Sequence, residues 1–326
     1  MKRQVLAGIA LAAAGALALV GCSSAEKPAN SGDDAKFTIG INQFVQHGAL
    51  DAATAGFKKA FEDADIDVTF EEKNANGEQA TAVTIAQGFA SKKPDLVLAV
   101  ATPSAQATAQ ALADVPVLFT AVTDAEEAKL VETNAKPGGN VTGTSDLAPI
   151  DKQLELIQQI VPDAKSVGIV YASGEVNSQV QVDAAIDAAK PLGIEIVSKT
   201  VTTPNDIQQA TESLGDVDAI YVPTDNMVVA GIAALVQVAE AKQIPVIGAE
   251  SGTVDGGAVA TVGIDYFKLG YQTGEMAIRI LKDGDDPADM SVEVAKEHAY
   301  VVNPGAAERM GVELPKSILD QADIVE

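Results

Sequence analysis

The strongest constraint in this sequence is an alternation of short apolar runs with helical patterns, which occurs twice along the chain. Helical periodicity separates the first runs, which lie at residues 37–41, 67–71, 95–100 and 115–119. Strands and helices in this order fold as a parallel sheet with helices on its faces. Residues 95–100 are almost entirely apolar, which is typical of a parallel strand buried on both sides. This part of the chain therefore predicts an α/β fold with a doubly wound parallel sheet.

A glycine-rich segment over residues 137–143 ends this series, and a second series of similar length follows. Its strand-like runs cover residues 166–171, 194–199, 218–222 and 245–248. The 326 residues suit two domains of ordinary size. Open α/β sheets bind ligands beyond the carboxyl ends of their strands. Two such lobes that face each other can enclose one small molecule and close around it at a hinge.

The start of the chain has the features of a secretory signal. Lys2 and Arg3 precede an uncharged apolar run that is shorter than the roughly 20 residues of a membrane span. The run ends at Cys22, which resembles the lipobox of bacterial lipoproteins, in which the cysteine is acylated and becomes the mature N-terminus. We therefore expect a signal peptide over residues 1–21, a lipid on Cys22 and a flexible tether over residues 22–35. The folded part would then lie on the extracellular face of the membrane, in the cell envelope.

Composition excludes several kinds of function. The formal charge of −24 repels phosphate backbones, so nucleic acid is a poor partner. One cysteine and two histidines, His47 and His298, exclude an intramolecular disulfide and a metal site built from several Cys or His side chains. We therefore expect no cofactor and no metal. The sequence also shows no nucleophile elbow, histidine metal motif or phosphate loop, which argues against an enzyme.

Several segments that follow the expected strands carry a resemblance to a known family. They are IGINQFVQHGALD at residues 39–51, FTAVTD at 119–124, GGNVTG at 138–143, YASGEVNS at 171–178, YVPTDN at 221–226 and GIDY at 263–266. In this order, over nearly the full mature length, they resemble the substrate-binding lipoproteins of ABC importers, of the tryptophan/tyrosine type. The chain departs from the family at Asp124-Ala125, where Asp-Pro is common, and this departure leaves the turn geometry there open.

The resemblance implies the two-lobed, type I fold of periplasmic binding proteins, in which the chain crosses between the lobes three times. Lobe one would comprise residues 36–144 and about 264–290, and lobe two residues 145–263 and about 291–326. The resemblance also implies a monomeric receptor without catalytic activity. It would capture a free amino acid, with tryptophan, tyrosine or phenylalanine as the expected ligands, and deliver it to ABC permease subunits.

The expected ligand contacts in lobe one follow its strands. Gln43 and His47 come after the first strand, although His47 could instead cap the next helix. Thr102 and Ser104 begin a helix after the third strand, and N–H groups at a helix start bind anions, so we expect them to hold the ligand carboxylate unless they merely cap that helix. The remaining expected contacts are Ala121, Thr123, Asp124 and Ser145.

The expected contacts in lobe two include the partner of the ligand ammonium group. An ammonium group needs an anion, because burying it unpaired is costly. Asp225 is the first choice, with Glu175 and Asp265 as further candidates, and each of the three could instead cap a helix. The other expected contacts in this part of the chain are Asn177, Ser178, Thr224, Asn226 and Glu250.

Three other functions stay open at this stage. One is a receptor for another small polar solute, such as a sugar or a small acid, although sugar receptors of this fold commonly use Trp and Arg, and this chain has no Trp and only three Arg. Another is a ligand sensor without a transport role, such as a transcription regulator. Regulators of this fold carry an N-terminal DNA-binding module, whereas this chain has its expected signal and tether at that position. An extracellular enzyme that uses a carboxylate pair is the last.

Overall fold

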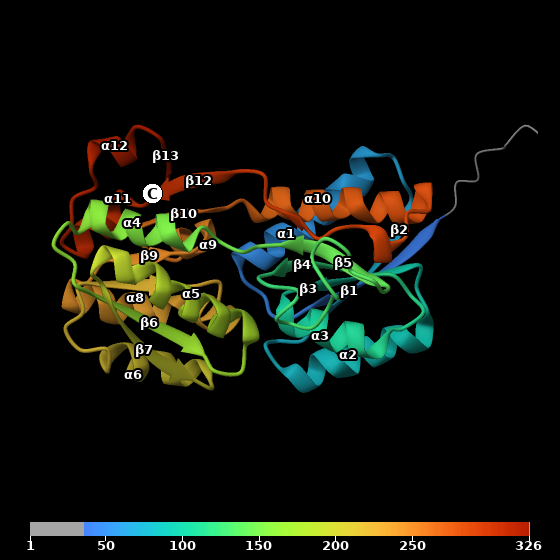
Figure 1. The fold of residues 1–326 in the computed structure, drawn as a ribbon, viewed down its shortest axis with the longest axis horizontal. Helices are drawn as coiled ribbons and strands as arrows, with labels where there is room; N and C mark the ends of the chain where they lie inside the picture. The colour runs from blue at the N-terminus through green and yellow to red at the C-terminus, as the bar shows by residue number, and fades with distance from the viewer. Residues whose placement is uncertain (1–35, 326) are drawn as a thin grey trace, which may run out of the picture. The chain divides into compact units, whose positions relative to one another are not determined.

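The structure, a computed structural model, describes residues 36–325, so the expected signal peptide, Cys22 and the whole of the expected tether lie outside the described residues. Residues 36–325 form two lobes, each built on one sheet (Figure 1). Both series of strands and helices expected from the sequence are present, which confirms the α/β fold with two doubly wound sheets. No helix within residues 36–325 is long and apolar enough to cross a bilayer.

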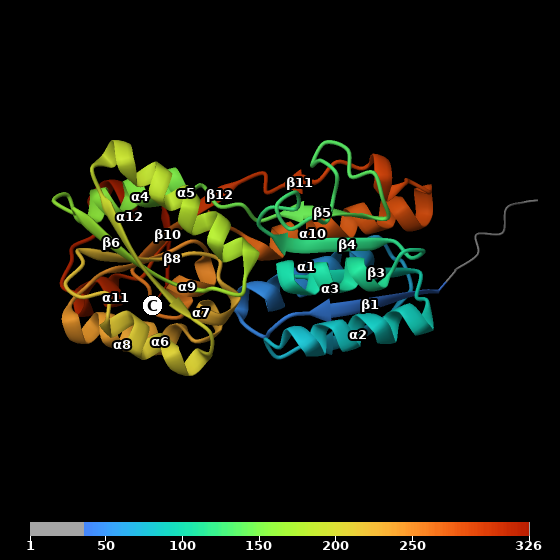
Figure 2. The ribbon, with the colours of Figure 1, turned by 60° about the horizontal axis from the view of Figure 1, so that its bottom comes forward.

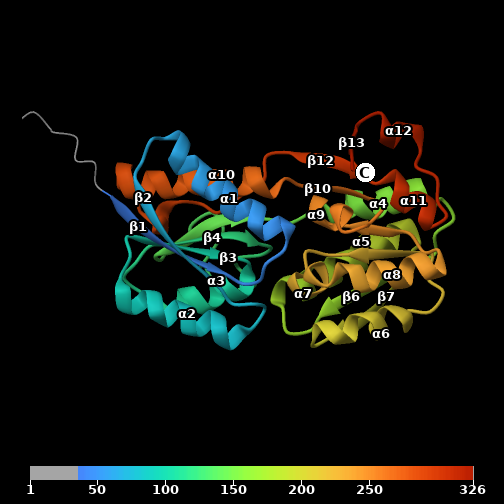
Figure 3. The same cartoon turned by 180° about the vertical axis from the view of Figure 1, so that it is seen from behind.

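The sheet of the first lobe has the strand order β11-β5-β4-β3-β1-β2, and its neighbouring strands are all parallel. Its strands are β1 (Phe37–Gln43), β2 (Val68–Asn74), β3 (Leu96–Val100), β4 (Val117–Val122), β5 (Val141–Ser145) and β11 (Glu293–Val294). Its helices are α1 (Gly48–Asp63), α2 (Gln79–Lys92), α3 (Thr102–Ala111) and α10 (Tyr266–Ile278), with the short helical segments η2 (Arg279–Asp283) and η3 (Pro287–Asp289). Helices α1 and α10 cover one face of the sheet and α2 and α3 cover the other (Figures 1 and 3).

Close packing of α1 on α10 fixes the position of α10 in the first lobe. A Cβ added to Gly270 of α10 would lie 1.9 Å from the carbonyl oxygen of Ala53 in α1, and one added to Gly56 would lie 2.0 Å from that of Phe267. Only glycine therefore allows the two backbones to approach this closely. Tyr266, the first residue of α10, is 4 % exposed and belongs to the apolar core of the first lobe.

The sheet of the second lobe has the strand order β13-β12-β10-β9-β8-β6-β7. Its strands are β6 (Ser166–Ala172), β7 (Glu195–Val201), β8 (Ala219–Val222), β9 (Val246–Gly248), β10 (Ala260–Ile264), β12 (His298–Val302) and β13 (Ala322–Ile324). Its helices are α4 (Ile150–Ile160), α5 (Val176–Leu192), η1 (Pro204–Asp206), α6 (Ile207–Glu212), α7 (Asn226–Ala230), α8 (Ile232–Lys242), α9 (Ser251–Asp255), α11 (Pro304–Arg309) and α12 (Lys316–Leu319). Strands β10 and β12 pair antiparallel, while the other neighbours are parallel.

The chain passes between the two sheets three times, after β5, between β10 and α10, and between β11 and β12 (Figure 2). The last crossing lies later than the position near residue 291 that we expected. Glu293 and Val294 still belong to the first sheet, because they pair with Thr144 and Ser145 and extend that sheet beyond β5. Each lobe is therefore assembled from separate stretches of chain.

Candidate functional site

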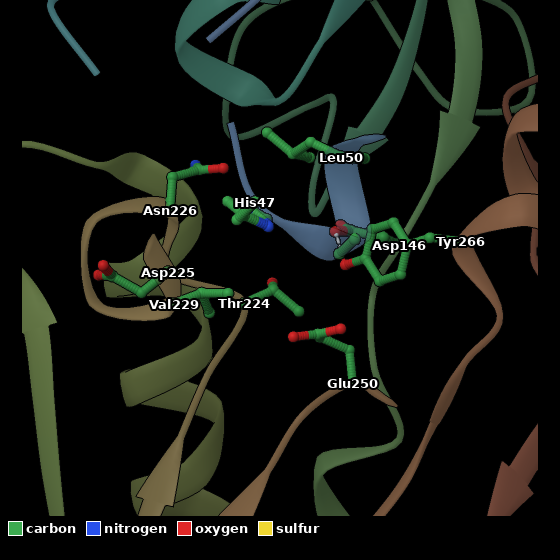
Figure 4. Close-up of a pocket in the computed structure, with 11 residues that line it drawn as sticks. His47, Leu50, Asp146, Thr224, Asp225, Asn226, Val229, Glu250 and Tyr266 are labelled. Carbon is green, nitrogen blue, oxygen red and sulfur yellow. Dashed lines mark hydrogen bonds between the residues drawn. The ribbon is translucent and has the colours of Figure 1, made fainter. Parts of the chain in front are cut away.

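A small, enclosed pocket lies between the two lobes, at the carboxyl ends of strands from both sheets. The space between its lining residues is about 270 Å³ when the solvent at its mouth is included. Figure 4 shows its side chains converging from elements of both lobes. The lining residues are His47, Ala49, Leu50 and Ala121 from the first lobe, Thr224, Asp225, Asn226, Val229 and Glu250 from the second, and Asp146 and Tyr266 at two of the crossings.

The backbone turns sharply where two central strands of the first lobe reach the cleft. Ala101, directly after β3, has φ of 79°, and Ala121, near the end of β4, has φ of 57°. Residues with a Cβ rarely adopt positive φ, and such strain is concentrated at binding sites and active sites. Both turns bring the chain to the pocket edge, where Ala121 is part of the lining.

A directed chain of hydrogen bonds crosses the cleft and ends on Asp146. Tyr266 donates its hydroxyl proton to Asp146 Oδ2 at 2.5 Å, and Thr123 donates to Oδ1 at 3.1 Å. The Thr123 and Thr224 hydroxyl oxygens lie 3.4 Å apart. Because the Thr123 proton is already directed at Asp146, Thr224 acts as donor to Thr123. Gln181 completes the chain by donating to the Thr224 hydroxyl at 2.7 Å. The two lobes are thus joined by a polar contact beside the pocket.

Glu250 is the pocket carboxylate with an unused oxygen. It follows β9, is 1 % exposed and caps α9 by accepting the Gly252 N–H on Oε2 at 2.6 Å. Its other oxygen, Oε1, is buried and has no hydrogen-bond partner within residues 36–325. Burial, with smaller contributions from Asp255 and Asp146, raises the pKa of Glu250 to about 7. A buried carboxylate with a free oxygen has a strong tendency to pair with a cation.

His47 also has polar atoms that the described chain leaves unused. Both ring nitrogens are buried, and neither has a hydrogen-bond partner in the described part of the chain. Burial lowers the pKa of His47 to about 4, although the nearby Asn226 amide and the Asp51 carboxylate offset part of the effect. The ring is therefore neutral near pH 7 and offers one donor and one acceptor to the pocket.

Asp225 and Glu175 form an acidic centre on the second-lobe side of the pocket. Asp225 caps α7 through Val228 N and also accepts hydrogen bonds from Ala172 N at 2.6 Å and the Ser178 hydroxyl at 2.7 Å. Burial raises the pKa of Asp225. Glu175 accepts hydrogen bonds from the side chains of Asn177 and Asn226 and from two backbone N–H groups, and burial together with the Asp225 charge raises the pKa of Glu175 to about 8.

These contacts change the expectation for the ligand ammonium group. Asp225 was the first choice, but its two oxygens already accept three hydrogen bonds from the protein, so it acts as a structural cap. Glu250, which we expected only as a general contact, has the free oxygen. Among the other expected residues, His47, Ala121, Thr224 and Asn226 line the pocket, and Thr123 supports it through the interlobe chain.

Two further expected residues keep an unused polar atom close to the cleft. Thr102, at the start of α3, is 2 % exposed, and its hydroxyl has no hydrogen-bond partner within residues 36–325. Asn177 donates to Glu175, Ser178 and the Thr224 carbonyl, but its Oδ1 likewise has no partner among the described residues. Buried polar atoms are usually satisfied, so both positions are suited to a ligand or a water molecule.

The other expected residues use their polar side chains in hydrogen bonds within the protein. Gln43 stabilises the loop between β1 and α1 through hydrogen bonds with Val45 O, Asp51 and Thr54. Ser178 donates to Asp225. Ser104 donates to buried Asn42, and Ser145 donates to the Thr123 carbonyl. Asp124 accepts hydrogen bonds from the N–H groups of Glu126 and Glu127. Asp265 caps α10 by accepting a hydrogen bond from Lys268 N. The capping contacts of Asp124 form the turn at which the family commonly has proline.

Sequence reasoning missed five lining residues, which are Ala49, Leu50, Asp146, Val229 and Tyr266. Asp146 and Tyr266 each adjoin an expected residue, and they meet only because two of the crossings lie side by side. Their signal in the sequence was their place at the expected crossings. Leu50 and Val229 resemble core residues of amphipathic helices, so nothing in the pattern distinguishes them.

A larger groove also lies between the lobes, with about 1530 Å³ of space when the open solvent at its mouth is included. Asn226 lines both spaces. Phe44, Gln79 and Pro103 line the groove from the first lobe, and Gly174, Glu175 and Met227 are among its second-lobe residues. The cleft therefore has an inner, enclosed part and an outer part that is open to solvent.

Comparison with known proteins gives a consistent result. The family model described as "ABC transporter substrate binding protein" matches residues 38–326. A curated relative, the "Tyrosine-binding protein" of Clostridioides difficile strain R20291, is 42% identical over 313 residues, which cover 93% of this chain and 90% of the relative. Both the extent of the match and the identity are well beyond what a shared fold alone requires.

Two solved structures are similar over most of the chain. One is an ABC domain from Streptococcus pneumonia in complex with L-Trp, at 34% identity and a TM-score of 0.86, covering 90% of this chain and all of the other. The other is the ligand-free, open structure of a substrate-binding protein with adhesive properties from Clostridium difficile, at 44% identity and a TM-score of 0.69, covering 89% of this chain and 99% of the other.

Proposed function

Because this chain belongs to the family of ABC transporter substrate-binding proteins, we propose that it is the receptor of an importer for an aromatic amino acid. The family comprises binding proteins and not enzymes. The observation that carries the proposal is the buried, unused oxygen of Glu250 in a pocket closed by both lobes. That oxygen suits an ammonium group, which every free amino acid carries.

The ammonium group binds between the two carboxylates of Glu250 and Asp146. Asp146 already accepts two hydrogen bonds, but its charge raises the pKa of Glu250, so the two groups are close enough to repel each other. A cation placed between them removes this repulsion and supplies the proton donor that Oε1 lacks. A sugar hydroxyl would donate a hydrogen bond to Oε1 of Glu250 but would not neutralise the charge of the carboxylates.

The carboxylate group binds at the start of α3. The Thr102 hydroxyl is buried and free to donate, and the first N–H groups of a ten-residue helix have no partner inside the helix. No Lys or Arg lines the pocket, so a carboxylate held here relies on hydrogen bonds and the helix terminus.

The ring packs against apolar side chains that line the pocket, such as Leu50 and Val229. The names of two relatives favour an aromatic ligand, since one is a tyrosine-binding protein and another was solved with L-Trp. The neutral ring of His47 adds a donor and an acceptor that the polar part of such a ligand can use.

Binding is accompanied by closure of the lobes at the three crossings. The TM-score of this chain is higher with the L-Trp complex than with the open, ligand-free relative, although the open relative has the higher sequence identity. The higher structural similarity to the complex favours a closed arrangement of the lobes in this chain. The contact between Thr123 and Thr224 joins the lobes in this closed state.

The receptor acts at the extracellular face of the membrane, anchored by a lipid on Cys22. The support for this part of the proposal is the sequence pattern at the start of the chain, with two cations, an apolar run and the lipobox-like cysteine. An anchored receptor stays close to its permease, which raises the rate of delivery. Radiolabelled palmitate incorporation that is lost in Cys22→Ala tests the anchor.

Binding itself is tested by a thermal-shift panel of the twenty amino acids and common sugars, followed by titration. The chain has no Trp, so L-Trp bound to the protein can be followed by its own fluorescence without protein background. We expect an aromatic amino acid at 100 times its Kd to stabilise the protein by about 2.7 kcal/mol. Stabilisation by sugars alone would contradict the proposal.

The matched pair Glu250→Gln and Glu175→Gln tests the site. Both variants replace a buried carboxylate with an amide of the same size, but Glu175 already uses its oxygens within the protein. Glu250→Gln should weaken amino-acid binding about 100-fold, or about 2.7 kcal/mol, and Glu175→Gln only a few-fold. The reverse order would move the ammonium site to the acidic centre formed by Asp225 and Glu175.

A further inference from the structure

The outer groove offers much more room than the inner pocket. The inner pocket contains Glu250 and Asp146, the two carboxylates that the proposed function assigns to the ammonium group of the ligand. The groove beyond it is about 1530 Å³ and lies between the same two lobes. Asn226, which is 7 % exposed, borders both spaces, so a ligand that passes this side chain enters the groove.

The walls of the groove indicate what chemistry it accepts. Phe44 and Pro103 from the first lobe and Met227 from the second present apolar surface, and thioether and aromatic groups both pack well on rings. The ionisable groups that line it are Glu78 and Glu175, and its lining has no Lys, Arg or His. A neutral, ring-bearing substituent therefore finds apolar surface there and no charged group that it would leave unpaired.

We infer that the outer groove is a second subsite, which accepts a bulky, uncharged extension on the ring of an aromatic amino acid whose polar head is held in the inner pocket. The inference rests on the proposed function, because the inner pocket must first hold the head. It widens the range of ligands from free amino acids to ring-substituted derivatives.

Two ligand pairs test the subsite on the whole protein. They are L-Trp with 5-benzyloxy-L-Trp, followed by indole fluorescence, and L-Tyr with O-benzyl-L-Tyr, followed by calorimetry. In each pair the second ligand differs by one neutral ring and its linker. We expect the extended ligand to bind within about ten-fold of its parent, since a clash in a closed pocket would cost far more.

A groove-filling variant locates the extension. A Cβ added to Gly174 meets no atom within 4 Å, so Gly174→Phe adds a ring to the groove without a clash at its base. We expect it to weaken binding of the extended ligands at least about ten-fold and binding of the parents less than about three-fold. Gly139→Phe is the matched control, because Gly139 has the same free space but lies outside the groove, and it should change neither.

The outcomes separate the subsite from the proposed function. If a parent binds and its extended partner loses more than about 100-fold, the second subsite is wrong and the receptor function stands. The same holds if Gly174→Phe weakens both ligands of a pair equally. If no parent and no extended ligand binds to the unmodified protein, the proposed function fails and the inference fails with it.

Discussion

Two acidic centres lie in the cleft, and they differ in what their oxygens do rather than in how deeply they are buried. Asp225 and Glu175 are 0 % and 6 % exposed, and Glu250 and Asp146 are 1 % and 3 % exposed. The oxygens of the first centre are occupied by donors from β6, α5 and α7, which makes it part of the architecture of the second lobe. The second centre spans the boundary between the lobes and keeps one oxygen free.

The difference shows how to distinguish a structural carboxylate from a ligand-binding one. Burial raises the pKa of Asp225, Glu175 and Glu250 alike, so a shifted pKa does not separate the centres. The two centres are separated by the number of carboxylate oxygens that have no hydrogen-bond partner. A cap with all its donors in place stabilises the fold, whereas an orphaned oxygen in a closed pocket needs a partner from outside the chain.

The largest expected effect is on folding and concerns the first centre. Asp225→Ala removes the acceptor of three buried hydrogen bonds and should lower the free energy of unfolding by about 4 kcal/mol, measured by denaturant titration of the ligand-free protein. Glu250→Gln should not lower it. Equal destabilisation by the two variants would mean that the two acidic centres do not differ in their contribution to folding.

The next effect concerns binding and pH. Glu250, with a pKa of about 7, must lose its proton before it can pair with an ammonium group. Affinity for the amino acid should therefore fall about ten-fold for each pH unit below 7, as titrations at pH 5, 6, 7 and 8 would show. In Glu250→Gln the affinity should be nearly constant over this range. A profile that persists in Glu250→Gln but disappears in Glu175→Gln would transfer the role to the first centre.

Stability without ligand should change with pH in the opposite sense. The pKa of Glu250 lies above its ordinary value of 4.5, so between these two values the folded protein holds a proton that the unfolded chain has lost. Stability therefore falls as pH rises through this interval. Glu250→Gln should remove this loss and stabilise the protein at pH 8 by about 2 kcal/mol, measured as a higher Tm. A lower Tm would mean that Oε1 has a structural partner.

The smallest expected effect concerns the contact between the lobes. Thr224→Val keeps the side-chain shape but removes both the donor to Thr123 and the acceptor for Gln181, and each neutral hydrogen bond contributes about 1 kcal/mol. Ligand affinity should fall about five-fold, as fluorescence titration would show. A double-mutant cycle with Thr123→Val should show coupling, because the two hydroxyls act together. Additive effects would mean that the contact does not support closure.

Much of the fold could be predicted from the sequence, because it depends on local patterns. Strands β3 and β4 are buried on both faces and were visible as apolar runs. The position of β11 was not predictable, since two residues carry no periodic signal and their place depends on pairing with β5. The antiparallel pairing of β10 with β12 also depends on the path of the chain and not on the composition of the strands.

The candidate site was predictable only in outline. Positions after strands correctly indicated His47, Thr224, Asn226 and Glu250 as pocket residues. Their roles could not be read, because capping and ligand binding use the same residue types, and Asp225 fits both. The distinction rests on hydrogen bonds to Ala172 N and Ser178, which are distant in sequence.

The three crossings of the chain have a consequence for how the protein is made. Synthesis from the N-terminus completes β1 to β5, then most of the second lobe, and only then α10 and β11, which return to the first. The first lobe thus remains incomplete until α10, whose glycines pack closely against α1, has been synthesised. Asp146 is also translated well over a hundred residues before Tyr266, its partner at the pocket. A nascent chain released before α10 would therefore hold a nearly finished second lobe, an uncovered first lobe and no binding site.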